Sequence, residues 1–330
     1  MTSLLLSTLP FLPLLVAGHA DLSSKRGLAL ISSTPDSDIT FLTAQDSPIA
    51  WYYTWSPYSH PAVSSSDAVF LPLLHGVDAA EDDELTSILG RAPGSSTHLL
   101  TFNEPDHIED DGGSDISPED AAEAYIEYIV PLRNGSSSDG RTWNISHPSV
   151  TGSGQGIEWL RAFNESCWEI DSRNGCPTDF IAVHYYGDFP GLAGWLGTLR
   201  EFYGDMSSGG DDDDDVPPMW ITEMAFAGED DEANVAMLNE SMAYLDEQDW
   251  VQGYAWFGAF RSDDANEWTG DGVSMLDDDG GLTELGADYL GGEDNGFEKG
   301  MNAGVALKPD WSLFMASAVV ILRLMGYTAV

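Results

Sequence analysis

The chain reads HLLTFNE over residues 98–104 and MWITE over residues 219–223. Each stretch is a short, nearly continuous apolar run that ends in a glutamate, Glu104 or Glu223. Apolar runs of this length are typical of parallel strands that are buried on both faces. Since the carboxyl ends of parallel strands meet at one edge of a sheet, the two runs predict two carboxylates at the same edge.

Further apolar runs of the same kind occur along the chain, separated by turn residues or by helical patterns. Strand and helix alternate in this way over about 250 residues, which favours an α/β fold, a (β/α)8 TIM barrel, over a doubly wound sheet. No Gly-x-Gly-x-x-Gly motif follows the first run, so a dinucleotide site has no support. We expect one catalytic domain over residues 21–290. The other six candidate strands span residues 27–31, 49–55, 68–74, 145–151, 180–185 and 253–257.

Two of the intervening segments carry clear helix signals. Ser117 followed by Pro118 and two acids predicts an N-cap and a first helical turn, and Pro131 predicts the end of that helix. Apolar residues at helical spacing predict a second helix over residues 232–245.

Glu104 and Glu223 lie about three βα units apart in the chain, so both reach the same mouth of a barrel. Two carboxylates that converge there suit glycoside hydrolysis, in which one must carry a proton and the other must be ionised. The alternative for each glutamate alone is a solvated loop acid or a member of an ion pair. The strand-end residues His184, Tyr185, Tyr186, Trp256 and Phe257 lie at the same mouth in this prediction; His184 is alternatively a hydrogen-bonded core histidine.

Several motifs match a known family. Residues 102–106, FNEPD, are similar to the Asn-Glu-Pro signature of clan A glycoside hydrolases, and residues 220–225, WITEMA, resemble the nucleophile strand of that clan. Over residues 25–290 the chain resembles the fungal catalytic domains of glycoside hydrolase family 128. The other matching segments are KRGLA (25–29), WYYTW (51–55), PLLHG (72–76), HPSV (147–150), IEWL (157–160), HYYG (184–187), YAWFG (254–258) and LTELG (282–286).

The resemblance implies a barrel that cleaves β-1,3-glucan with retention, more readily within the chain than from its end, and that needs no cofactor or metal. It implies that Glu104 is the acid/base and Glu223 the nucleophile. Asn103 would bind the sugar 2-hydroxyl. The remaining implied substrate-site residues are Tyr186 or Tyr185 as the hydrogen-bond partner of Glu223, Trp55 and Trp256 as stacking platforms, and Trp51 and His184 as further contacts.

Two positions depart from the family pattern, because Thr54 replaces an asparagine and Tyr185 replaces a tryptophan. These changes bear on the sugar subsites more than on the reaction. Three rival functions stay open: a non-catalytic glucan-binding protein of the cell wall, a clan A relative that cuts another β-glucan, and a transglycosylase that transfers the sugar to another sugar.

The charge of the chain limits its partners. Lys and Arg number 12 against 56 Asp and Glu, which gives a net charge of −44. So acidic a surface repels phosphate backbones, which excludes nucleic acid as a partner but leaves a neutral polysaccharide acceptable. We expect a monomer. The five acids of residues 211–215 indicate a solvated loop insertion, with calcium binding as the alternative.

Cys167 and Cys176 are the two cysteines of the chain, and an even count in a secreted protein predicts a disulfide between them. Their spacing fits no zinc motif. N-glycosylation sequons, which are surface signals of the secretory pathway, begin at Asn134, Asn144, Asn164 and Asn239.

Both ends of the chain read as targeting segments. Residues 1–20 are apolar and close in small residues, which predicts a cleaved signal peptide and secretion. Residues 291–310 predict a polar linker, and the apolar tail 311–330 predicts a GPI-anchor signal with attachment at Asn302. The alternatives for the tail are a membrane span or a hydrophobic terminal helix. The expected location is the cell surface or cell wall, with a lipid anchor as the one membrane contact.

Overall fold

A computed structural model describes residues 22–64, 66–206 and 216–306 of the chain. The predicted signal peptide (1–20), the acidic run (211–215) and the C-terminal tail (311–330) lie outside the described residues. Among the helices that the structure describes, none has the length and apolar character needed to span a bilayer.

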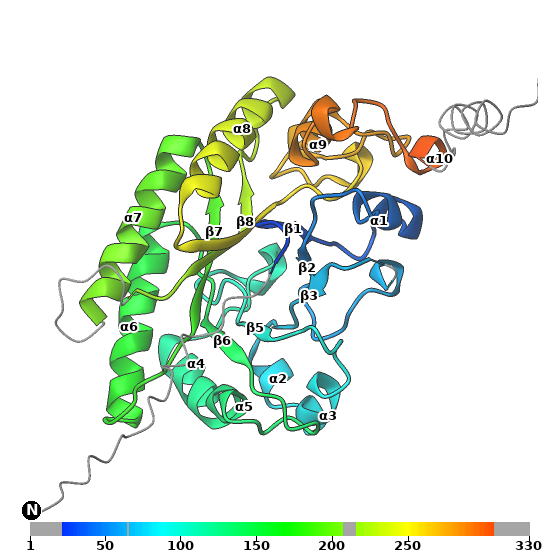
Figure 1. The fold of residues 1–330 in the computed structure, drawn as a ribbon. Helices are drawn as coiled ribbons and strands as arrows, with labels where there is room; N and C mark the ends of the chain where they lie inside the picture. The colour runs from blue at the N-terminus through cyan, green and yellow to red at the C-terminus, as the bar shows by residue number, and fades with distance from the viewer. Residues whose placement is uncertain (1–21, 65, 207–215, 307–330) are drawn as a thin grey trace, which may run out of the picture.

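The centre of the fold is one sheet of nine parallel strands in the order β3-β2-β1-β9-β8-β7-β6-β5-β4. Figure 1 shows this sheet curled, with the helices arranged around its outside. The α/β class and the parallel sheet are therefore as predicted. The strands are β1 (Arg26–Ala29), β2 (Trp51–Tyr53), β3 (Val69–Phe70), β4 (Leu73–Leu74), β5 (His98–Thr101), β6 (Asn144–His147), β7 (Phe180–Tyr186), β8 (Met219–Ala225) and β9 (Val251–Trp256).

Each of the eight predicted runs contains a strand, and the run over residues 68–74 contains two. Pro72 lies between β3 and β4, where it has no N–H to donate to a ladder. The amide of Leu71 still donates to the carbonyl of Tyr52 on β2, and the carbonyl of Pro72 accepts from Leu100 on β5. The chain thus changes its neighbour from β2 to β5 within two residues.

Three long helices follow β6, β7 and β8 and cover that side of the sheet (Figure 1). They are α6 (Gly154–Ile170), α7 (Phe189–Met206) and α8 (Asp231–Glu247), and the predicted helix over 232–245 is confirmed by α8. The shorter α-helices are α1 (Asp36–Leu42), α2 (Val77–Ala80), α3 (Leu85–Leu89), α4 (Pro118–Ala124), α5 (Val130–Arg133), α9 (Glu284–Tyr289) and α10 (Ala303–Ala306). Short 3-10 turns are η1 (Pro61–Val63), η2 (Glu109–Asp111), η5 (Ser262–Asp264), η6 (Asp271–Val273) and η7 (Glu293–Asn295).

The prediction that Pro131 ends the helix after Ser117 is wrong. Ser117 does cap α4, since its hydroxyl accepts from the amide of Asp120. The helix then continues through a π-helical segment, η3 (Tyr125–Ile129), into α5. The wide π turn resets the hydrogen-bond register, so Pro131 falls in the first turn of α5, where a missing N–H costs little.

The predicted linker from residue 291 is also wrong over its first ten residues. The amide of Leu282 donates to the carbonyl of Met301, and the amide of Gly300 donates to the carbonyl of Leu282. Phe297 is buried in the main core. These contacts bind the segment to the domain, so the boundary at residue 290 is too early. Asn302 follows directly, and lipid attachment there stays a prediction.

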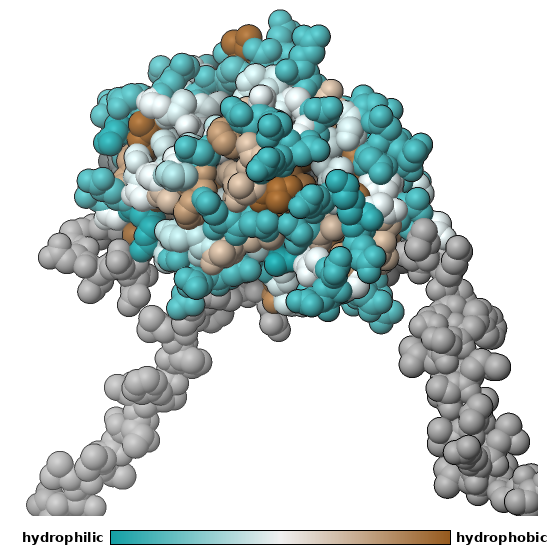
Figure 2. Space-filling view, turned by 90° about the horizontal axis from the view of Figure 1, so that it is seen from above, coloured by the Kyte–Doolittle hydropathy of each residue, from teal (hydrophilic) through white to brown (hydrophobic). Residues whose placement is uncertain are grey.

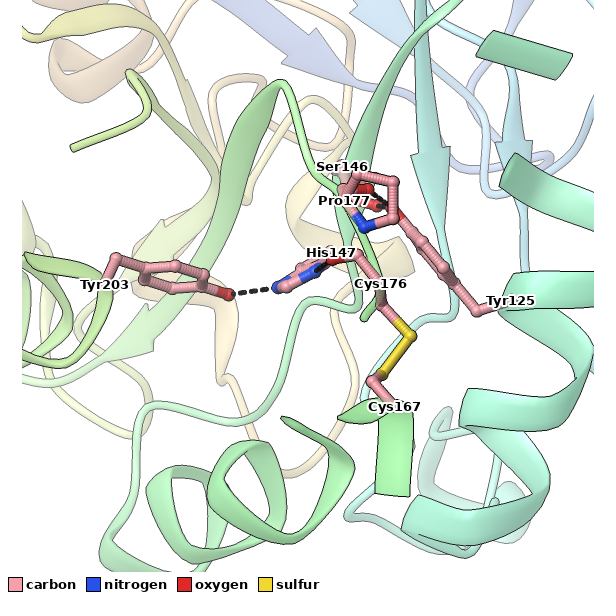
Figure 3. Close-up of a disulfide and its surroundings, with 7 residues drawn as sticks. All are labelled: Tyr125, Ser146, His147, Cys167, Cys176, Pro177 and Tyr203. Carbon is pink, nitrogen blue, oxygen red and sulfur yellow. Dashed lines mark hydrogen bonds between the residues drawn. A yellow bond between two sulfur atoms is a disulfide. The ribbon is translucent and has the colours of Figure 1, made fainter. Parts of the chain in front are cut away.

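The predicted disulfide is confirmed, because Cys167 near the end of α6 is bonded to Cys176 in the loop before β7. Figure 3 shows His147, at the end of β6, beside it: Nε2 lies 2.7 Å from the carbonyl of Cys176 and Nδ1 lies 3.1 Å from the hydroxyl of Tyr203 on α7. Burial lowers the pKa of His147 to about 4, so the ring is neutral. Nε2 therefore donates to Cys176, Tyr203 donates to Nδ1, and the disulfide loop is tied to β6 and α7.

The sequon asparagines differ in exposure. Asn134 and Asn239 are exposed, Asn164 on α6 is half-buried, and Asn144 is half-buried at the start of β6. Their glycosylation stays a prediction. The face shown in Figure 2 is largely hydrophilic with some hydrophobic residues near its centre, as the charge of the chain leads one to expect.

A small inner core fills the concave side of the sheet near the amino ends of its strands. Trp51 and Trp220 meet edge to face there with ring centroids 5.0 Å apart. The indole N–H of Trp51 donates to the carbonyl of Lys25 at 2.9 Å, and the side chain has no exposed surface. Trp51 is thus a packing residue at the far end of the sheet, and its prediction as a substrate contact is wrong.

We expect Gly253→Ala to destabilise the fold by about 1–3 kcal/mol, because a larger residue overfills this inner core. A Cβ at Gly253 would lie 2.5 Å from the ring of Trp220 and 2.9 Å from Nε1 of Trp51. The matched control is Gly197→Ala on the exposed face of α7, where a Cβ meets no atom within 4 Å. That change should stabilise the helix by about 0.5–1 kcal/mol. Urea denaturation measures both, and equal midpoints for Gly253→Ala and wild type would contradict the packing argument.

Candidate active site

Glu104 follows β5 on a backbone that is held in an unusual conformation. Phe102 and Glu104 have φ of 30° and 41°, in the left-handed region that non-glycine residues seldom adopt. The amide of Glu104 donates to the carbonyl of Ser149 at 2.7 Å, and the amide of Asn103 donates to the carbonyl of His75 at 2.9 Å. Backbone of this kind persists only where its surroundings fix it, and it is common at functional sites.

Glu223 lies inside β8 and is almost fully buried. Its Oε1 accepts from the hydroxyl of Tyr53 at 3.0 Å and from the indole N–H of Trp55 at 2.9 Å. Its Oε2 accepts from the hydroxyl of Tyr186 at 2.6 Å. Three donors from β7 and from β2 with the residues that follow it thus fix the position of this carboxylate and favour its charged form.

His184 on β7 lies between the two glutamates. Its Nδ1 is 2.9 Å from Oε1 of Glu104, and its Nε2 is 3.4 Å from Oε1 of Glu223. One carboxylate oxygen of Glu104 lies within 4.8 Å of one of Glu223. The two sequence-predicted carboxylates therefore converge at one point, and His184 is a buried histidine whose ring faces both of them.

The three groups shift one another's pKa. Burial raises the pKa of Glu104, but the hydrogen bond and charge of His184 outweigh it, so the net pKa is lowered. Burial lowers the pKa of His184, but the charges of Glu223 and Glu104 raise it above its usual value. Burial raises the pKa of Glu223; the charge of His184 and the bonds from Tyr186 and Trp55 only partly offset this. The pKa shifts therefore favour the protonated form of His184 and the charged form of Glu104, which share a hydrogen bond.

Glu104, His184 and Glu223 are also the one group among the described residues whose donor atoms converge closely enough for a metal ion. Both oxygens of Glu223 already accept hydrogen bonds from Tyr53, Trp55 and Tyr186, and a metal would have to compete with those donors. The expectation of no metal and no cofactor stays a prediction.

Asn103 lies next to Glu104 and is almost fully buried. Its Nδ2 donates to the carbonyl of Gly112 at 3.1 Å, which orients the amide. Its Oδ1 has no hydrogen-bond partner among the described residues. A buried acceptor without a partner is unusual in a folded protein, and it agrees with the expected role of Asn103 in binding a sugar hydroxyl.

The structure separates the aromatic residues that the sequence grouped together. Tyr186 donates to Glu223, whereas the hydroxyl of Tyr185 lies beside Gly187 and Gly191. Tyr186 is therefore the predicted partner of Glu223, and a contact of Tyr185 with the substrate stays a prediction. Trp55 is half-buried at the mouth and holds Glu223.

Trp256 has no exposed surface, and its indole N–H donates to the carbonyl of Val273 at 2.8 Å. Its prediction as a stacking platform is wrong, because no face of the ring is open to a sugar.

Two site residues, Tyr53 and Trp268, were missed, whereas Phe257 was expected at the mouth without an assigned role. Tyr53 was recoverable, since it lies two residues before Trp55 and thus on the same face of its strand. Phe257 follows β9 and contacts the rings of Trp55 and Tyr186 at centroid distances of 5.9 and 5.7 Å. Trp268 lies in an irregular loop and contacts the ring of Tyr186 at 4.7 Å. No periodic pattern marks a loop residue such as Trp268, so its place in the site could not be predicted.

A hollow of about 770 Å³ lies beside the site, between α2 and α4. His75 and the segment 112–116 form its end nearest Glu104, and acidic side chains line the rest. Neither Glu104 nor Glu223 contributes to its wall. The paired carboxylates therefore lie in the mouth of the sheet and not in this hollow.

Comparison with known proteins agrees with this geometry. The chain matches the glycosyl hydrolase catalytic core family over residues 27–289. No curated protein matches it.

Solved structures of glycoside hydrolase family 128 are similar to the chain. An endo-β-1,3-glucanase from Sorangium cellulosum (subgroup II) is 25% identical, with a TM-score of 0.61 over 81% of this chain and 98% of that one. A curdlan-specific exo-β-1,3-glucanase from Blastomyces gilchristii (subgroup III), in complex with glucose, is 26% identical, with a TM-score of 0.61 over 81% and 97%. An oligosaccharide-binding protein from Cryptococcus neoformans (subgroup VII) is 23% identical, with a TM-score of 0.59 over 83% and 94%.

The family match covers most of the chain and includes both glutamates, His184 and the strands that carry them. The protein therefore belongs to the glycosyl hydrolase catalytic core family, in agreement with its resemblance to glycoside hydrolase family 128.

Proposed function

We propose that the protein hydrolyses β-1,3-glucan with retention of configuration, through a covalent glycosyl-enzyme intermediate. The observation that carries this proposal is the approach of Glu104 and Glu223 to within 4.8 Å. Retaining enzymes place their carboxyl groups about 5 Å apart, whereas inverting enzymes leave about 6.5–9.5 Å for a water molecule. This spacing favours a retaining mechanism over an inverting one.

Glu223 is the nucleophile in this proposal. It is the more deeply buried carboxylate, and donors from Tyr53, Trp55 and Tyr186 hold it in place. The bonds from Tyr186 and Trp55 oppose the rise in pKa that burial causes, and the three donors together fix the angle at which the carboxylate meets the anomeric carbon.

Glu104 is the acid/base, and it must carry a proton when the glycosidic bond breaks. In this proposal the proton comes from His184, whose pKa is raised and whose Nδ1 lies 2.9 Å from Oε1 of Glu104. A bound sugar excludes water from Glu104, whose side chain is still 13% exposed, and this desolvation favours the neutral acid. His184 is thus a proton source for Glu104 across a bond that already exists.

We propose that the curled sheet closes into a (β/α)8 barrel. β3 and β4 stand at the two ends of the strand order, yet only Leu71 and Pro72 separate them in the chain. We infer that they are the halves of one strand, which pairs with β2 on one side and β5 on the other. That arrangement supports the convergence of Glu104 and Glu223 on one mouth.

The cellular part of the proposal rests on the sequence alone. We propose an endo-acting, secreted, monomeric enzyme of cell-wall glucan turnover, with glycans at the sequons and a lipid anchor at Asn302. The similar proteins include an endo-glucanase, an exo-glucanase and an oligosaccharide-binding protein. Measurements of activity and of product size therefore distinguish the rival functions. A ladder of oligomers from a long β-1,3-glucan supports endo action, glucose alone contradicts it, and products longer than the substrate indicate transglycosylation.

We expect Glu223→Gln and Glu104→Gln each to lower kcat on a soluble β-1,3-glucan by at least about a thousandfold, because each removes a group that takes part in bond cleavage. Glu158→Gln on the exposed face of α6 is the matched control and should retain wild-type activity. Release of reducing sugar measures all three. Equal release by wild type and Glu223→Gln would leave the binding-protein function as the better explanation.

We expect the first product of a β-1,3-linked glucose oligomer to be the β-anomer, because two displacements at the anomeric carbon restore its configuration. Proton NMR during the first minutes of the reaction, before mutarotation, distinguishes the anomers. An α-product would show that Glu223 activates water instead of attacking the sugar.

We expect Tyr186→Phe to move the acid limb of the pH profile of kcat/KM to higher pH. The Tyr186 hydroxyl lowers the pKa of Glu223, so its loss raises that pKa and the nucleophile becomes protonated at a higher pH. Tyr185→Phe is the matched control, since the hydroxyl of Tyr185 lies beside Gly187 and Gly191, whereas that of Tyr186 bonds to Glu223. Acid limbs that coincide for wild type and Tyr186→Phe would contradict the role of this hydrogen bond.

A further inference from the structure

Trp268 is an exposed tryptophan at the mouth of the sheet. Among the exposed large apolar side chains of the described residues it has the highest exposed fraction, 61%. Exposing so large an apolar side chain is unfavourable unless something covers it in the working protein. The position of this side chain indicates which molecule would cover it.

The ring of Trp268 meets that of Tyr186 at 65° with centroids 4.7 Å apart. Tyr186 in turn donates to Oε2 of Glu223. Trp268 is therefore one residue removed from the nucleophile and lies on its side of the catalytic pair. The rings of Phe257 and Trp55 continue the same aromatic wall.

The loop that carries Trp268 is fixed. The side chain of Asn266 accepts from the amides of Trp268 at 2.9 Å and of Thr269 at 2.8 Å. Thr269 is fully buried, and its carbonyl accepts from the amide of Gly228, which follows β8. A ring on a fixed backbone loses little conformational entropy when a ligand covers it, so it suits binding.

We propose that Trp268 is a stacking platform for a glucose unit of the substrate on the nucleophile side of the cleavage point. This inference rests on the proposed function and adds a specificity-determining residue to it. The apolar face of a pyranose covers an aromatic ring well, and a neutral sugar is not repelled by the acidic surface. Binding at this position contributes equally to the ground state and the transition state, so it bears on KM and not on kcat.

The experiment titrates β-1,3-linked glucose oligomers into the inactive Glu223→Gln protein by calorimetry, with and without Trp268→Ala. We expect Trp268→Ala to weaken binding about tenfold and Trp268→Phe to restore part of the loss. The matched control is Trp168→Ala, which removes a tryptophan that is 47% exposed on α6 and should leave binding unchanged. In the active protein, Trp268→Ala should raise KM on the oligomer while kcat stays within about twofold of wild type. The acid limb of the pH profile should stay in place.

Two results would overturn the inference. Binding by Trp268→Ala as tight as that of Trp168→Ala would show that no sugar covers the ring. A fall in kcat with a displaced acid limb and unchanged binding would show that Trp268 acts through Tyr186.

The same titration separates this inference from the proposed function. If Trp268→Ala weakened oligomer binding but the wild-type protein released no sugar, the platform would be supported and the proposed hydrolysis would fail. Sugar release by wild type with normal binding by Trp268→Ala would refute the platform alone. If the Glu223→Gln protein bound no β-1,3-linked oligomer, both would fail.

Discussion

The contact on which the site depends is that of His184 with Glu104 and Glu223. Two carboxylates within 4.8 Å repel each other strongly when buried, and protonation of His184 between them offsets that repulsion. The same contact explains why the pKa of His184 is raised and that of Glu104 lowered. The parallel sheet supplies the geometry, because β5, β7 and β8 bring their carboxyl ends to one mouth.

Aromatic side chains support this contact at two depths. Near the amino ends of the strands, Trp51 and Trp220 fill the inside of the sheet, with Gly253 leaving room for their rings. At the mouth, Tyr53, Trp55 and Tyr186 turn polar hydrogens toward Glu223 instead. The inner layer thus provides a rigid base, and the outer layer provides donors. The left-handed backbone at Glu104 is held from neighbouring strands by the carbonyls of His75 and Ser149.

The sequence by itself determined the strands, the two carboxylates and the disulfide. Apolar runs of strand length mark every strand, and Glu104 and Glu223 stand out because each ends such a run. The pairing of Cys167 with Cys176 needed no more than their count and the predicted secretion of the chain. These features are local, so the sequence carries them directly.

Only the tertiary structure decided how deep each aromatic residue lies and which neighbour it meets. Alternation along a strand tells the face but not the depth, so Trp51 and Trp55 look alike in sequence although one closes the core and the other holds Glu223. A register shift at Val183 and His184 makes the faces of β7 harder to assign, and there Tyr186 instead of Tyr185 reaches the nucleophile. Trp268 comes from a loop without periodicity, and Phe297 joins the core from a segment that reads as a linker. Depth and loop placement depend on contacts between residues far apart in the chain, which no local pattern records.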